Sequence, residues 1–414
     1  MTVYSPFPTV EINGGIYYPD NTISRISITT GRRNIYEQPP AGYAVIELWT
    51  TADAPLTIAL SDTVTVRIQD SNGDYQKIYT GTISDIDIVL EAYGDVGNIA
   101  RYTLTAVGVL AILNKRTTGA LGFAKEFDGT RIYNILSDAF LQAWDELSPS
   151  LEWQQVNALT TWENWDSTSQ ALLDNLAAQI DVPGDYELTA YSGGAANAYE
   201  LAQDAAQSGR GMLYEDAEGA LWYDSYSSRA SQTPLVLTAD DLLADGLRQA
   251  AQWSEIVNDV EVTYKNNQSK FSADGISQEL YGQLAGTRET QLENGTDAQA
   301  QADAFLESRA YARTYPEELT IPLHSPTVLD TTRDALIAMK VGSSIYTQAL
   351  PAVFGTVFDG FVEGMRWEID RYRANLILTC SAISETYPHA IWLQIAPTVT
   401  WNSYTPITDR WIDL

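Results

Sequence analysis

The side chains that most often carry catalysis or hold metal ions are scarce in this chain. It has two histidines, His324 and His389, and one cysteine, Cys380. A zinc site needs three or four Cys or His ligands at suitable spacing, and that spacing is absent. Neither a G-x-S-x-G serine-hydrolase elbow nor a G-x-x-x-x-G-K-[ST] phosphate loop occurs. A Ser-His-Asp triad is defined by geometry and stays open, although His324, directly before a Ser-Pro dipeptide, is more simply a loop residue.

Carboxylates are abundant, and a glycosidase needs only two of them at a suitable separation. One stretch could line a sugar-binding groove, because it places Trp144, Trp153, Trp162 and Trp165 near Glu152, Glu163 and Asp166. Aromatic side chains that pack helices against a β-barrel would give the same pattern, and packing is the commoner reason for it. Binding or cleavage of host cell-wall glycan is therefore the main alternative to a non-enzymatic, structural role.

The net charge is strongly negative. The chain carries 54 acidic and 24 basic residues, which gives a formal charge of −30. Nucleic-acid binding relies on Lys and Arg to replace condensed counterions, so we expect no sequence-specific binding of nucleic acid. An acidic channel, in contrast, lets DNA pass without adhering to it. Such acidity also keeps proteins soluble, which is the simpler explanation from composition alone.

Cysteine usage and hydropathy indicate a protein made in a reducing cytoplasm. A single cysteine cannot form an intrachain disulfide. The first residues, Met1–Pro6, show no basic region followed by an apolar one, so no secretory signal is expected. No apolar run approaches the ~18 residues of a membrane helix, and we expect no stable membrane insertion. No cofactor is predicted.

Apolar periodicity changes along the chain. The first 110 residues alternate with period two, as strands with one buried face do, and Asp70–Asp74 contains the Asn-Gly pair of a tight hairpin turn. That turn faintly resembles a calcium loop but lacks its bidentate Glu. Later segments predict helices over 130–147, from Ser167, over 197–209 and near 297–314, a hairpin of Met212–Tyr214 with Leu221–Tyr223, and strands again from Val257.

An internal repeat links the two strand-rich regions. Three pairs of blocks agree in order and apolar phase: Ile23–Ile28 with Val257–Val262, Ile78–Ile83 with Val357–Val362, and Leu104–Ala106 with Leu378–Cys380. The second pair also shares a central glycine. Because alternation alone is common in antiparallel sheets, the shared order is what favours a repeat. We interpret it as two copies of one small β-barrel. Three such chains would present six similar surfaces and could match a sixfold ring.

Several segments, taken in order, resemble tail hub proteins of long-tailed bacteriophages, which include minor tail proteins and Tal-like baseplate hubs. The segments that carry the resemblance are Ile26–Arg33, Gly42–Leu48, Tyr79–Asp85, Tyr102–Ala106, Gly211–Gly219, Val257–Val262 and Gln278–Gly282. The resemblance covers roughly residues 20–385. It implies a virion protein, assembled in the host cytoplasm, that forms a homotrimer at the distal tail tip and carries two tail-tube-like barrels in each chain.

The predicted fold is therefore strand-rich α+β, with two tail-tube-like β-barrels and an inserted mixed α/β domain. Residues 1–112 form the first barrel, 113–255 the lateral insertion, and 256–389 the second barrel with a helix near 297–314. The resemblance implies a distal tail protein or tail tube above, spike, fibre or other minor tail proteins below, and a possible tape measure partner. Asp85 and Asp87 are candidate acids facing the lumen of the DNA channel.

The last segment, residues 390–414, combines tryptophans with proline and threonine. It is too short for a domain and unusually aromatic for a disordered tail. Trp392, Trp401 and Trp411 are predicted to dock on a neighbouring subunit or on the next tip protein. An edge strand folded back on its own barrel would explain the same composition.

Overall fold

The computed structural model describes residues 4–17, 23–51, 55–92, 98–140, 176–243, 246–250, 253–312 and 315–387. The Trp144–Trp165 cluster, the helix expected from Ser167 up to residue 175, His389 and the C-terminal tryptophans lie outside these residues. No helix in the described part of the chain is both long enough and apolar enough to cross a membrane.

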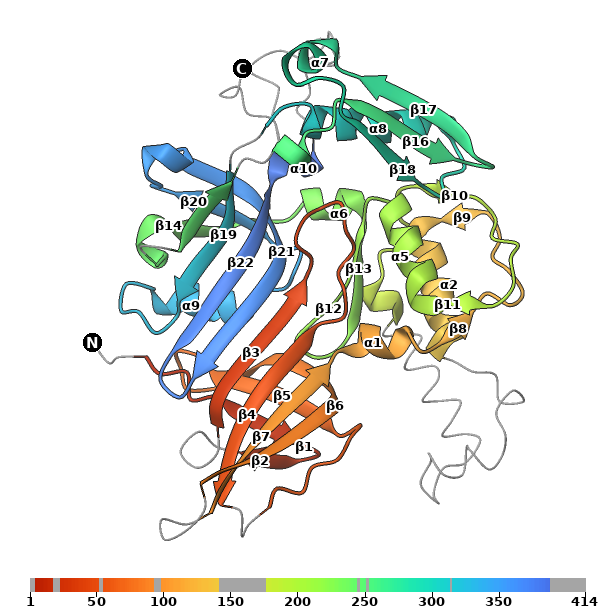
Figure 1. Ribbon diagram of the computed structural model, residues 1–414. Coiled ribbons are helices and arrows are strands. Elements are labelled where there is room, and N and C mark those ends of the chain that lie inside the picture. Colours follow the sequence, from red (N-terminus) through yellow and green to blue (C-terminus); the bar gives the residue numbers. More distant parts are fainter. Residues whose placement is uncertain are drawn as a thin grey trace.

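One large, mostly antiparallel sheet forms the centre of the molecule (Figure 1). Its strands run in the order β15 (Leu247–Ala250), β19 (Tyr315–Pro322), β22 (Ala374–Ala382), β21 (Val357–Asp370), β3 (Ile23–Gly31), β4 (Tyr43–Thr51), β7 (Ile99–Val107), β6 (Tyr75–Ala92), β5 (Thr63–Gln69), β1 (Thr9–Ile12) and β2 (Gly15–Tyr17). Beside this path, β20 (Ser344–Gln348) pairs with β21 and, in parallel, with β14 (Leu235–Thr238).

The sheet contains the same four-strand unit twice. The first unit is β3-β4-β7-β6, and the second is β15-β19-β22-β21. The registers agree as well as the order. Ile46 of β4 lies opposite Leu104 of β7, and Leu319 of β19 lies opposite Leu378 of β22. Outside each unit, β5 pairs with the first half of β6 as β20 pairs with the first half of β21. These registers confirm that the chain has an internal repeat.

A shared bulge strengthens the equivalence. The β6–β7 register shifts directly after Ile83, which lies opposite Ala106, and the β21–β22 register shifts directly after Val362, opposite Cys380. Two residues before each of these positions is a glycine with an aromatic ring over it. A Cβ at Gly81 would lie 2.8 Å from the Tyr79 ring, and one at Gly360 would lie 2.6 Å from the Phe358 ring. Both glycines are therefore required by the same close approach.

Two of the three predicted block matches are thus confirmed, and the third is wrong. The expected partner of Ile23–Ile28 was Val257–Val262. The strand found there, β16 (Asp259–Tyr264), pairs with β17 (Gln268–Ala273) and β18 (Ala285–Glu289) in a separate sheet. The counterpart of β3 is instead β15, because Leu247 lies opposite Leu319 as Ile26 lies opposite Ile46.

The described strands do not close into two separate barrels. The edge that would close the second unit on itself pairs with the first unit instead, because residues 364–370 of β21 are hydrogen-bonded to β3. The two units are consequently joined side by side in one open sheet. The strand-rich α+β class is confirmed, and the chain forms a curved wall rather than two closed barrels.

A lateral part packs beside the first unit. It comprises α1 (Val109–Leu113), β8 (Thr117–Thr118), β9 (Glu126–Phe127), α2 (Asp128–Phe140), β10 (Glu187–Leu188), β11 (Ala196–Asn197), α5 (Ala198–Ser208), β12 (Met212–Glu215), β13 (Leu221–Asp224) and α6 (Tyr226–Ala230). The prediction for α5 is confirmed: the Asn197 side chain caps its N-terminus and Gly209 follows its last turn. The β12–β13 hairpin is confirmed too.

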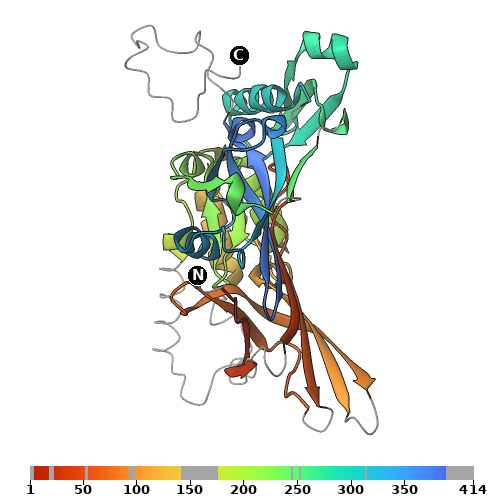
Figure 2. The same ribbon diagram turned by 90° about the vertical axis from the view of Figure 1, so that its left-hand side faces the viewer.

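A second lateral part lies at one end of the large sheet (Figures 1 and 2). It consists of the β16–β18 sheet with α7 (Gly275–Tyr281) and α8 (Gly295–Arg309). The helix predicted near 297–314 thus begins and ends a little earlier. Further helices in the described residues include α9 (Asp330–Ile337), α10 (Ile383–Thr386) and short 3-10 turns at Ala239–Asp241, Trp253–Glu255 and Ala352–Phe354. A short helix follows each repeat, α1 after β7 and α10 after β22.

The two faces of the large sheet differ. One face contributes the main core, which runs through both repeats and includes Ile26, Ile46, Leu104, Trp367 and Leu378. Helices and the β12–β13 hairpin cover this face, whereas the other side of the sheet is uncovered in Figure 2. Alternation along the strands therefore places one row of side chains in the core and the next row on an open surface.

Candidate functional site: the repeat junction and the open face of the sheet

Glu363 lies at the junction between the two repeats. It is the extra residue of the β21 bulge and is fully buried. Its Oε2 accepts a hydrogen bond from Arg32 Nε at 2.6 Å, and its Oε1 accepts bonds from Arg229 at 2.8 Å and from Ser381 at 2.6 Å. Burial alone would raise the pKa of Glu363, but the Arg229 and Arg32 guanidiniums outweigh it and lower the pKa to about 2.

This network ties three parts of the chain together. Arg32 directly follows β3 of the first repeat, Glu363 belongs to the second repeat, and Arg229 belongs to α6 of the lateral part. The backbone N–H of Arg32 also donates to the Glu363 carbonyl at 2.7 Å. Removing one partner from such a buried pair leaves an uncompensated charge, so the network holds the junction in a single arrangement.

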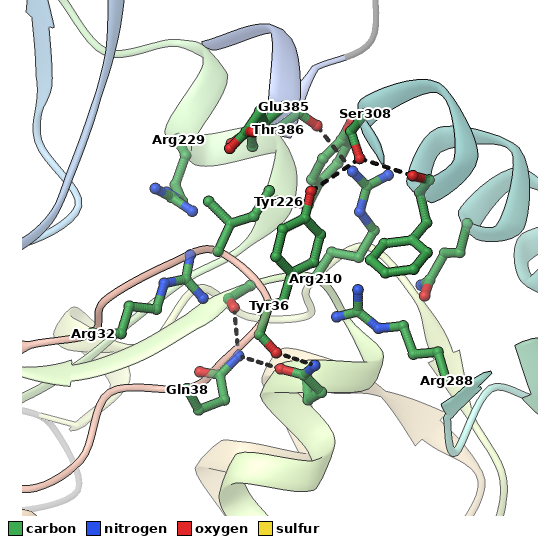
Figure 3. A pocket seen from close by; sticks show the side chains of 15 residues that line it. Arg32, Tyr36, Gln38, Arg210, Tyr226, Arg229, Arg288, Ser308, Glu385 and Thr386 are labelled. Atoms are coloured by element: carbon green, nitrogen blue, oxygen red, sulfur yellow. Dashed lines mark hydrogen bonds between the residues drawn. The ribbon is translucent and has the colours of Figure 1, made fainter. Parts of the chain in front are cut away.

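Arginines also line a small pocket, partly open to solvent, next to this junction (Figure 3). Arg229 of α6, Arg288 of β18, and Arg32 and Arg210, which follow β3 and α5, converge on it. Arg288 forms no ion pair with a described residue, and burial together with the neighbouring Arg210 lowers its pKa to about 10. The one carboxylate of the described lining, Glu385, is engaged, since it accepts a bond from Tyr315 at 2.9 Å. Such a lining suits an anion rather than a metal ion.

Glu215 forms a second buried anchor. It ends β12, and its carboxylate accepts hydrogen bonds from the backbone N–H groups of Gly42 and, at 3.0 Å, of Leu110. Burial raises the pKa of Glu215 to about 7, against the opposing effect of these backbone donors. The carboxylate fits only because Gly108 has no side chain, as a Cβ there would overlap it. The hairpin is thereby fixed to the first repeat.

The open face of the sheet carries the predicted lumen acids. Asp85 and Asp87 are exposed on the second half of β6. Registers across the sheet extend each of them into a row of mostly polar side chains. One row is Asp87, Thr103, Glu47, Arg25 and Asp370; the other is Asp85, Thr105, Val45, Ser27, Glu368 and Asn375. Carboxylates outnumber arginine in these rows. Arg101 and Arg366 lie on the same face and form ion pairs with Glu47 and Glu368, so the face keeps a smaller negative charge than the rows alone would give.

The other residues singled out from the sequence have structural roles or lie outside the described residues. Among the described residues, no group of His, Cys, Asp and Glu could hold a metal ion. Asp70 forms the predicted turn, where its carboxylate accepts backbone N–H bonds from Asn72 and Asp74 at 2.9 Å. His324 lies in a loop with Nδ1 3.4 Å from the Ala374 carbonyl. Trp392, Trp401 and Trp411 lie outside the described residues, so their docking role stays a prediction.

Sequence reasoning missed the arginine-carboxylate network. A signal for Glu363 exists, because it is a lone charge inside the apolar run from Phe361 to Met365. Its partners carry no such signal, since Arg32 and Arg229 are separated from it by 331 and 134 residues.

Comparison with known proteins gives matches in structure alone. No protein-family model matches the chain, and no curated sequence is significantly similar to it. The 43 kDa tail protein of prophage MuSo2 from Shewanella oneidensis matches with a TM-score of 0.58 at 13% identity, over 92% of this chain and 98% of its own. A tail protein from Neisseria meningitidis gives 0.59 at 13% identity with the same coverage. The chain shares their fold.

A third match extends the comparison to another host. The prophage tail protein gp18 from Listeria monocytogenes has a TM-score of 0.50 at 9% identity and covers 90% of this chain and 94% of its own. The similarity therefore spans the repeats and both lateral parts rather than one domain. It supports the expected tail-protein resemblance at the level of the fold.

Proposed function

We propose that this chain is a non-enzymatic structural protein of a phage tail. Three copies form a ring at the distal tip of the tail and join a sixfold tail tube or distal tail protein to a threefold spike or fibre apparatus. The observation that carries this proposal is the repeated four-strand unit, within a fold that matches prophage tail proteins over nearly the full length of both chains.

The repeat supplies the symmetry. Each chain presents two similar units side by side, so three chains in a closed ring present six. One side of such a ring can match a sixfold partner through these equivalent units. The lateral parts occur once in each chain, and they can give another side the threefold symmetry that a spike or fibre requires. Other minor tail proteins and the tape measure protein are further expected partners.

The open face of the sheet suits a DNA channel. Its rows of mostly polar side chains, in which carboxylates outnumber arginine, form a hydrated surface of net negative charge. Such a surface repels the phosphate backbone and favours passage over adhesion. In this proposal the ring sits in the virion at the tail tip, after assembly in the host cytoplasm, and forms part of the ejection channel.

Mass measurement tests the ring. We expect native mass spectrometry of the concentrated, full-length chain to detect a trimer, and images of tail particles to show a ring at the tip with this chain in it. A chain that stays monomeric and is absent from any ring in tail particles contradicts the proposal. Release of soluble fragments from purified host cell wall by the chain would instead favour the glycan-cleaving alternative.

A further inference from the structure

The junction between the two repeats shows how one four-strand unit joins the next. Residues 364–370 of β21 pair antiparallel with β3, with Trp367 opposite Ile28 and Ile369 opposite Ile26. This pairing buries the apolar side chains of β21: Trp367 and Ile369 are each only 2% exposed. The junction is therefore a continuous sheet with a closed apolar face beneath it.

The first repeat has the same strand segment without the partner. The shared bulge aligns residues 85–91 of β6 with residues 364–370 of β21, so that Ile88 corresponds to Trp367 and Leu90 to Ile369. No described strand pairs with this edge of β6. Ile88 and Leu90 are 56% and 54% exposed, although their counterparts are buried. An apolar edge of this kind is a template for pairing with another strand.

The second repeat, in turn, leaves the complementary strand open. β15 corresponds to β3 and stands at the end of the sheet, with no described strand on its outer side. The chain thus has the two halves of the β21–β3 junction, one at each end of its pair of repeats. Figure 1 shows β6 and β19, the inner neighbour of β15, on opposite sides of the sheet.

We propose that the second half of β6 in one copy pairs antiparallel with β15 of the next copy, and that this pairing repeats the intrachain junction. The register follows from the alignment: Leu90 lies opposite Leu247, Val89 opposite Arg248, and Ile88 opposite Gln249. It places Leu90 and Ile88 on the apolar side of a sheet that continues from copy to copy. Because the two edges are different surfaces, the contact is head-to-tail and generates a ring when the rotation closes.

The charges at the two edges also favour pairing between two copies of the chain. Arg248 is 63% exposed, and its described ion pair, with Glu318, is long at 3.9 Å. In the proposed register Arg248 lies diagonally from Asp87 on the acidic face, within reach of a long side chain. The edge of β15 therefore presents a cation where the edge of β6 presents a carboxylate. The ring of three rests on the proposed function, whereas the pairing of the two edges rests on the strand registers.

Cysteine cross-linking tests the register. The variant Val89→Cys with Arg248→Cys places thiols on directly opposed residues of two copies, whereas the native Cys380 is buried. We expect mild oxidation of the full-length double variant to give reducible dimers and trimers on denaturing gels. The matched pair Asp85→Cys with Arg248→Cys is displaced by about 13 Å along the strand and should not cross-link.

Charged edge substitutions test the contact independently. Ile88→Lys with Leu90→Lys should abolish the oligomer, because charged side chains on a strand edge oppose pairing with another strand. The chain should keep its wild-type circular dichroism and cooperative melt, because both side chains are more than half exposed. Phe271→Lys, at a side chain on β17 that is 61% exposed, should assemble normally.

The outcomes separate the pairing from the proposed function. A trimer that forms without the Val89–Arg248 cross-link, and that survives the lysine pair, contradicts the pairing and leaves the tail-tip ring standing. A chain that forms neither oligomer nor cross-link at any concentration contradicts both.

Discussion

Two buried carboxylates that anchor this fold have pKa values shifted in opposite directions, because burial raises both and only one of them has cationic partners. Glu363 lies between two guanidiniums, and its pKa falls to about 2, so its ionised form stabilises the folded chain. That stability is present above the unfolded pKa near 4.5 and is lost as pH falls toward 2. Glu215 has only neutral backbone donors, and burial raises its pKa to about 7. Its ionised form is therefore less favourable in the folded state than in the unfolded chain.

Glu215 should make the fold less stable as pH rises. Between pH 4.5 and 7 the unfolded chain loses this proton while the folded chain keeps it, so the free energy of unfolding falls by about 3 kcal/mol across that window. The variant Glu215→Gln cannot titrate. We expect it to be less stable than wild type at pH 5, because the amide replaces one acceptor oxygen, and to lose part of this deficit at pH 8. Urea unfolding at both pH values measures the difference.

Comparing the two proteins at each pH cancels the titration of every other group. Glu218→Gln, an exposed change on the same hairpin, is the matched control and should keep the same offset at both pH values. An offset for Glu215→Gln that does not change with pH would show that Glu215 does not titrate as inferred.

At the scale of elements, the β12–β13 hairpin depends on space beside β7. A Cβ at Gly108 would overlap the Glu215 carboxylate, so Gly108→Ala should destabilise the fold by about 1–3 kcal/mol through overpacking. In a background of Glu215→Ala the same change should cost much less, because the obstructing carboxylate is gone. A double-mutant cycle, followed by urea denaturation, measures this coupling.

Gly275→Ala is the control for glycine replacement itself. This residue begins α7 and has no neighbouring atom within 4 Å of the added methyl group. Its replacement should be neutral or stabilise slightly, since alanine reduces the entropy of the unfolded chain. Equal losses at Gly108 and Gly275 would rule out the steric explanation.

Strand periodicity predicted the strand-rich regions of both repeats but not which strands share a sheet. The blocks at Ile78–Ile83 and Val357–Val362 were matched correctly, because a glycine and a bulge fix their phase. The first block was matched to Val257–Val262, which alternates well, whereas the real counterpart is the short and partly polar β15. Alternation reports that one face of a strand is buried; it does not report which sheet buries it.

The junction is harder to predict than the elements for a related reason. Arg32, Arg229 and Glu363 are far apart in sequence, and neither arginine stands out from its neighbours along the chain. Only the pairing of β21 with β3 brings Arg32 and Glu363 together. The prediction of two tail-tube-like barrels is not confirmed by the described strands, because periodicity cannot say whether a strand edge pairs with its own unit or with the next one.

At the scale of the whole molecule, the repeated sheet gathers part of the negative charge on one face. Taken alone, the net charge of −30 explains only the solubility of the chain. The sheet, however, places carboxylates in rows on one uncovered face of both repeats, across strands from β6 to β21. In a ring built by continuing that sheet, this face forms one continuous surface, while the apolar face stays covered by helices.

If the open face lines a channel, reversing its charge should convert a surface that repels DNA into one that binds it. Asp85→Lys with Glu368→Lys changes two residues of one open-face row and leaves Asp87, which faces Arg248 in the proposed contact, unchanged, so the ring should still assemble. We expect the variant ring, unlike wild type, to bind labelled double-stranded DNA at low salt, with an affinity that falls steeply as salt increases. Glu279→Lys with Asp303→Lys makes the same change in net charge on exposed residues of α7 and α8. Fluorescence anisotropy measures DNA binding by both variant rings. Cations that lie close together inside a ring act on DNA jointly, so the open-face variant should bind more tightly than the control. Equal binding by the two would mean that net charge, rather than the open face of the sheet, governs contact with DNA.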